Sequence, residues 1–162
     1  MIGLQLGEEG MVGLVQLLRE NRIPYLEELS FHHCNLSERE CEHLSYCIQD
    51  GYCSGLVKLD LSSNHLKWKS ISIIRRMLCK QFLPHLSTLL LDDNQLGNKG
   101  IEELGNASDI DCLTQVKYLS LCHNHITDEG ASCIYLYILN KQWKAVEELV
   151  LNGIKNDYEV TQ

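Results

Sequence analysis

Three stretches of the sequence, LVKLDLSSNHL at residues 56–66, LSTLLLDDNQL at 86–96 and VKYLSLCHNHI at 116–126, share one pattern of apolar positions. They lie 30 residues apart with no insertion or deletion between them, and weaker copies begin at Leu26 and Val146. A fixed period of this size predicts a solenoid, in which one supersecondary unit stacks on copies of itself. Such a stack presents a long open surface rather than a closed pocket.

Each unit divides into a strand half and a helix half. The second and third apolar positions alternate with polar ones, which is typical of a half-buried strand. The spacing then changes, and Ile71, Ile74 and Met77 fall on one face of a helix. We therefore expect one domain over 1–154, made of a partial unit (1–25), four complete units (26–55, 56–85, 86–115 and 116–145) and a terminal strand (146–154), with a polar tail at 155–162.

The consensus of the units, L-x-x-L-x-L-x-x-(N/C)-x-L, resembles the leucine-rich-repeat motif. The stretch NHITDEG at 124–130 resembles the ribonuclease-inhibitor-like subfamily, which includes the repeat regions of NOD-like receptors. The resemblance implies an α/β solenoid shaped like a horseshoe, with five parallel strands on the concave face and helices on the convex face. It says little about function, because the family is defined by its scaffold.

The Asn position of the motif has a physical role. A turn carries backbone groups into the interior, where an unpaired N–H or C=O costs about 1–3 kcal/mol. An Asn side chain offers both a donor and an acceptor. We expect Asn64, Asn94 and Asn124 to form a ladder along the inner turn, with Cys34 at the first position. Ser37 followed by Glu40 predicts a capping box at the start of a helix.

Composition restricts the class of partner. The formal net charge is −8, which argues against general nucleic-acid binding and against an anionic membrane surface. No apolar run reaches the length of about 18 residues that a membrane span needs, and the longest, 131–139, fits a buried helix. The N-terminus does not resemble a secretory signal. We therefore expect an intracellular, cytoplasmic protein, or one delivered into a host cell if it is a bacterial effector.

Eight cysteines are present, and most occupy positions where the repeat favours a small apolar residue. In an intracellular protein such thiols are expected to be reduced and buried. The absence of a C-x-x-C motif argues against a structural zinc site, and we expect no cofactor.

The two ends of the sequence break the pattern. The chain begins halfway through a unit, and Ile154 stands where the Asn of the last unit would be. One interpretation is a segment of a longer repeat protein or a small protein with frayed ends. The other is self-association through exposed end strands, since an unpaired edge is a template for pairing.

The concave face can be deduced from the period, because parallel strands bring equivalent residues side by side. It combines an acidic patch with histidines and with two apolar anchors, Leu90 and Tyr118. Aromatic anchors inside a polar rim are typical of protein interfaces, although a solvated sheet face would carry similar residues. The candidate partner-binding residues are His32, His33, Lys58, Asp60, His65, Leu90, Asp92, Asp93, Tyr118, Cys122, His123 and His125.

Metal binding or catalysis at this face is a weaker hypothesis. Asp93 and His123, with Cys122 and His125 nearby, contain the components of a metal site and of a Cys–His nucleophile pair. Adjacent strand residues point to opposite sides, and an open sheet lacks a cavity that excludes water. We therefore expect no metal, no catalytic residue and no enzyme activity. The histidines are also candidates for pH-dependent binding.

The predicted function is non-enzymatic binding of a protein partner on the concave face. An alternative is a regulatory or sensor segment of a larger protein, as in NOD-like receptors, or a bacterial effector that mimics eukaryotic repeats. A GTPase-activating protein is a further alternative, which the family resemblance alone suggests.

Overall fold

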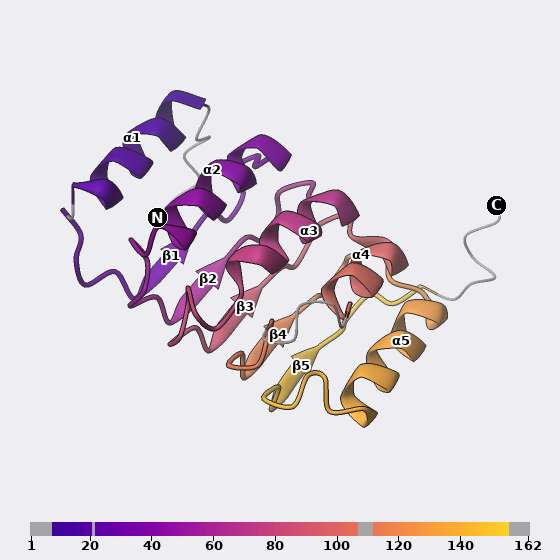
Figure 1. Cartoon of the computed structure of the whole chain (residues 1–162). Coiled ribbons are helices and arrows are strands. Elements are labelled where there is room, and N and C mark those ends of the chain that lie inside the picture. The colour runs from indigo at the N-terminus through magenta and orange to yellow at the C-terminus, as the bar shows by residue number, and fades with distance from the viewer. Residues whose placement is uncertain (1–7, 21, 107–111, 156–162) are drawn as a thin grey trace.

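The chain folds as a stack of β–α units in a computed structural model that describes residues 8–20, 22–106 and 112–155 (Figure 1). Residues 1–7 of the expected partial unit and 156–162 of the expected polar tail lie outside the described residues. Within the described residues, five strands form one parallel sheet in chain order. They are β1 (Glu28–Ser30), β2 (Lys58–Asp60), β3 (Thr88–Leu90), β4 (Tyr118–Ser120) and β5 (Glu148–Val150).

The register of the sheet equals the period of the sequence. Each strand residue pairs with the residue 30 positions later, so that Leu59 lies between Leu29 and Leu89. The same offset continues to Leu119 and Leu149. The predicted fold class, an α/β solenoid with five parallel strands, is confirmed.

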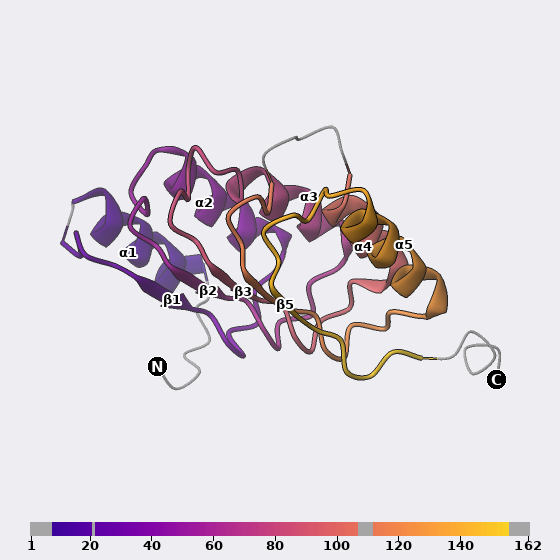
Figure 2. The same cartoon turned by 90° about the horizontal axis from the view of Figure 1, so that it is seen from below.

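The helices form a second layer on one side of the sheet (Figure 2). They lie in the order in which they occur in the chain, and each contacts the next. They are α1 (Glu8–Arg19), α2 (Glu38–Gln49), α3 (Trp68–Met77), α4 (Gly97–Leu104) and α5 (Asp128–Leu139). The capping box predicted at the start of α2 is present: the Glu40 side chain accepts the N–H of Ser37 at 2.9 Å, and the Ser37 hydroxyl caps the helix.

The core runs between the two layers along the whole stack. The repeated apolar positions of the three central strands, including Leu59, Leu89 and Leu119, are completely buried. The corresponding residues of the last unit, Leu149 in β5 and Leu151 just after it, are only partly buried, because β4 alone lies beside that strand in the described chain.

The predicted Asn ladder is present, and each Asn supports the unit before its own. Asn64 Oδ1 accepts the backbone N–H groups of Cys34 and Leu36 at 3.0 and 2.9 Å. Asn94 Oδ1 accepts those of Asn64 and Leu66 at 3.1 and 2.9 Å. The Nδ2 groups of both side chains donate to backbone carbonyls of their own and the preceding unit.

The ladder is incomplete at Asn124. Its Nδ2 donates to the carbonyls of Leu91 and Cys122, but its buried Oδ1 accepts no hydrogen bond from the described residues. The turn beside it differs from the others: after Asp93, its second positive φ lies at Gly97 (62°) rather than at Gln95, and Leu96 has α-helical dihedrals. Gly97 instead donates its N–H to the backbone carbonyl of Asn124 at 2.9 Å. A glycine adopts positive φ without steric cost, which permits this shifted turn.

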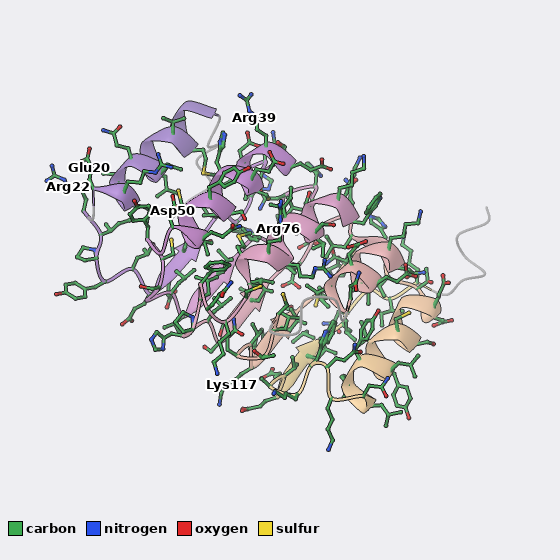
Figure 3. The ribbon with its side chains drawn as sticks, in the orientation of Figure 1. Glu20, Arg22, Arg39, Asp50, Arg76 and Lys117 are labelled. Carbon is green, nitrogen blue, oxygen red and sulfur yellow. The ribbon has the colours of Figure 1, made fainter. Side chains whose placement is uncertain are left out.

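Some ion pairs on the surface join equivalent residues of neighbouring units, and others are local. Lys117, at the periphery of the molecule in Figure 3, lies 2.9 Å from a carboxylate oxygen of Glu147. Glu20 and Arg22, labelled together in the same figure, are 3.3 Å apart within one turn of chain. These side chains are well exposed, and such pairs contribute little to stability.

The expectation that residues 131–139 form a buried helix is wrong. The segment lies in α5, whose only buried residues are Gly130 and Ile134. Four large apolar side chains on this helix are about half exposed or more: Tyr135, Leu136, Ile138 and Leu139. A run of apolar residues predicts a helix but does not show which sides of that helix a neighbouring element will cover.

Candidate functional site

The concave face is formed by the strand residues that alternate with the buried leucines. Lys58, Thr88 and Tyr118 are lateral neighbours in one row of this face. Asp60 and Leu90 are neighbours in the next row, where Ser120 follows. The sheet therefore brings these predicted site residues together as the period required.

The first acidic residue of the site is held by serines. Asp60 Oδ1 accepts the N–H of Ser62 at 3.0 Å, and its Oδ2 is 3.3 Å from the hydroxyl of Ser30 in the preceding unit. The Asp60 carboxylate thus links two neighbouring strands. Beside it, Lys58 forms an exposed ion pair with Glu28 at 3.7 Å, which partly neutralises the only cation among the candidate residues when the histidines are neutral.

Asp92 links neighbouring strands in the same way in the following unit. Its Oδ1 accepts the Ser120 hydroxyl at 2.6 Å and the N–H of Cys122 at 2.7 Å. Among the residues with described positions, none donates a hydrogen bond to Oδ2. One oxygen of Asp92 therefore fixes the strand ends, and the other is available to a ligand of the face. Asp93 beside it is exposed.

Four of the five candidate histidines occupy a backbone conformation that few residues adopt. His33, His65, His123 and His125 have φ between 51° and 57°. Asn, Asp and His are several-fold enriched among non-glycine residues at positive φ, so the turn itself favours them. The equivalent positions in other units hold residues such as Asn35, Asp93 and Gly153, also at positive φ. The fifth, His32, is exposed and has no such constraint.

This stereochemical role of the histidines was not predicted from the sequence. The signal was present, since one position in each unit holds His, Ser, Asp, His or Gly at intervals of 30 residues. Gly153 shows how tight the last of these turns is: a Cβ there would lie 2.5 Å from Nδ1 of His123.

The hypothesis of a metal or nucleophile site near Asp93 gains no geometric support. Within residues 8–20, 22–106 and 112–155 there is no group of three or more His, Cys, Asp and Glu side chains arranged to hold a metal ion. The Cys122 thiol contacts the Ser120 hydroxyl at 3.7 Å and the N–H of Asn152 at 3.4 Å. No interaction between this thiol and the His123 ring is found in the described portion of the chain.

Parallel strands at a fixed register, an internal Asn ladder and one layer of helices define a β–α solenoid with an open sheet face. The chain contains leucine-rich repeats: family models for the leucine-rich repeat match residues 55–77, 82–105 and 113–134. Leucine-rich repeats generally mediate protein–protein interactions and are typically non-enzymatic.

A solved structure shares the fold. Leiomodin-1 actin-binding site 2 superposes with a TM-score of 0.67 over 85% of this chain and 76% of that chain, at 16% sequence identity. At this identity the likeness concerns the fold alone. A search of curated proteins finds no match to the sequence. In the described residues, no helix has the length and hydropathy to cross a membrane.

Proposed function

We propose that this protein binds a protein partner on the concave face, at a patch formed by Leu90, Asp92, Tyr118 and His123. The observation that carries the proposal is the position of Leu90. It is an apolar side chain left only half-buried on the open face, in a row where Asp60 and Ser120 are its neighbours.

Tyr118 lies one strand along from Leu90 and two residues back. Strands about 4.8 Å apart and a rise of about 3.3 Å per residue place the two Cα atoms roughly 8 Å from each other. One partner side chain can therefore contact both anchors. The available oxygen of Asp92 and the exposed His123 provide a polar rim, which is the usual surrounding of an interface hot spot.

Binding is tested by affinity capture with the double variant Leu90→Ser/Tyr118→Ala. We expect the double variant to capture about 10-fold less of any specific partner than the parent chain does, or less still. The reason is that losing two anchors of an interface typically costs more than about 1.4 kcal/mol of binding free energy. The matched control is Tyr46→Ala, which removes an exposed tyrosine from α2 on the helical side.

Both variants must melt near the parent temperature for the comparison to hold. Capture that is equal for the parent and the concave-face variant contradicts the proposal and favours a merely solvated face. Loss of capture in Tyr46→Ala alone would indicate that the partner binds on the helical side instead.

Self-association is a second candidate, and the exposed apolar side chains of α5 support it. We propose that a second copy packs on α5 and on the edge strand β5. Sedimentation at increasing concentration should then show a species of twice the 18.5 kDa chain mass. Leu136→Glu and Leu139→Glu should return it to the monomer, whereas Val12→Glu on α1 serves as an exposed apolar control. A monomer at all concentrations would refute this assembly.

The regulatory, effector and GTPase-activating interpretations stay predictions, as do the ribonuclease-inhibitor-like subtype and the cytoplasmic location. No residue described on the concave face distinguishes among them. Nucleotide hydrolysis by a panel of small GTPases, with and without the chain, would test the GTPase-activating alternative directly.

A further inference from the structure

Two cysteines that the repeat does not align are in contact. Cys79 follows the end of α3, and Cys112 precedes the segment that leads into β4. Their sulfur atoms are 3.5 Å apart. Although all eight cysteines lie in the described residues, these are the only two whose sulfurs contact each other there.

The backbone around this pair suits a covalent link. Cys79 and Cys112 are direct partners in an isolated antiparallel bridge. Residues paired in this way have Cα atoms about 4.5–5.5 Å apart. That range lies inside the separation of about 4.4–6.8 Å that disulfides require. The sulfurs need to approach by only about 1.5 Å to reach the bond length of about 2.05 Å, which side-chain rotation can supply.

We propose that Cys79 and Cys112 form a dithiol modification site, which a low-molecular-weight disulfide such as oxidised glutathione converts into an intramolecular disulfide. The Cys79 thiolate attacks one sulfur of the small disulfide, and the other sulfur leaves as a thiolate. The Cys112 thiolate then attacks Cys79 Sγ in this mixed disulfide and displaces the second small thiolate. The two protein thiols lose two electrons and two protons, and the small disulfide becomes two thiols.

Accessibility separates this pair from the structural cysteines. Cys79 is partly exposed, so the small disulfide can reach it. Cys41 and Cys53 are completely enclosed in the core, and burial raises the pKa of each thiol to about 12. Because the thiolate is the reacting form, these two cysteines should remain unmodified while the chain is folded.

The disulfide would act as a staple between units. It joins the end of α3, in the unit 56–85, to the last segment of the unit 86–115. A bond that closes a loop of this size is expected to raise the melting temperature by roughly 5–10 °C relative to the reduced chain.

The experiment uses the full chain, first reduced and then incubated with oxidised glutathione, with the remaining thiols alkylated before digestion. Trypsin releases Cys79 in the peptide 77–80 and Cys112 in the peptide 100–117, and neither peptide holds another cysteine. We expect one cross-linked species of these two peptides, a loss of two hydrogen atoms from the intact mass, and the rise in melting temperature.

Cys79→Ser should abolish the cross-link and the temperature shift, and its reduced form should melt near the reduced parent because Cys79 is a partly exposed position. Cys133→Ser, at another partly buried cysteine, should retain both effects. Separate glutathione adducts without a cross-link, a link to any other cysteine, or no loss of thiols from the folded parent would each overturn the proposal.

Discussion

Leu89→Asn is expected to lower the free energy of unfolding of the chain by roughly 3–6 kcal/mol. Leu89 is completely buried in β3, between Leu59 and Leu119. Its replacement loses about 2–3 kcal/mol of apolar burial and places an amide with no available partner in the core, at a further cost of about 1–3 kcal/mol. The sum is a large fraction of a total stability of about 5–15 kcal/mol.

The matched control is Leu90→Asn, one residue further along the same strand. Leu90 points to the open face, where the new amide has Asp60 and Ser120 as neighbours and remains in contact with water. We expect a change in stability below about 1 kcal/mol for this surface substitution. Urea unfolding followed by circular dichroism measures both variants. Equal destabilisation by the two would show that the faces of the sheet are wrongly assigned.

Asn94→Ala is expected to destabilise the chain more than Asn124→Ala. The Asn94 change leaves two buried N–H groups, of Asn64 and Leu66, without their acceptor, and removes a donor from buried carbonyls. At about 1–3 kcal/mol for each unsatisfied group, we expect a loss of roughly 3–5 kcal/mol. The same measurement of urea unfolding applies.

Comparison with Asn124→Ala shows how much of the Asn94 effect comes from the hydrogen bonds that the Asn94 Oδ1 accepts. The Oδ1 of Asn124 accepts no hydrogen bond from the described residues, so its removal leaves no described N–H group unpaired. We expect this variant to lose only about 1–2 kcal/mol, from the carbonyls of Leu91 and Cys122 that its Nδ2 serves. If both variants lost the same free energy, the shifted turn at Gly97 would not be the solution conformation.

The segments of the fold that repeat were predictable from sequence, and the exceptions were not. The register follows from columns of leucine at intervals of 30, because apolar residues at equivalent positions must share one core. The shifted turn at Gly97 was not predicted, since the residues 94–96 fit the motif and only the backbone dihedrals reveal the difference.

The candidate site shows the same division. The lateral contacts of Asp60, Leu90 and Tyr118 follow from the register. The conformational role of His123 does not follow from the register, because the residue type alone cannot distinguish a residue that suits positive φ from one that binds a ligand. The Cys79–Cys112 contact was missed because these residues are not separated by a multiple of the period, so no column of the repeat aligns them.

The direction of the Asn ladder has a consequence for synthesis of the chain. Asn94 satisfies backbone groups at Asn64 and Leu66, which leave the ribosome about one period earlier. The units 26–55 and 56–85 therefore carry these amides without their Asn acceptor until the next unit has emerged and docked. Translation pauses within this interval would prolong the time during which these amides lack their Asn acceptor.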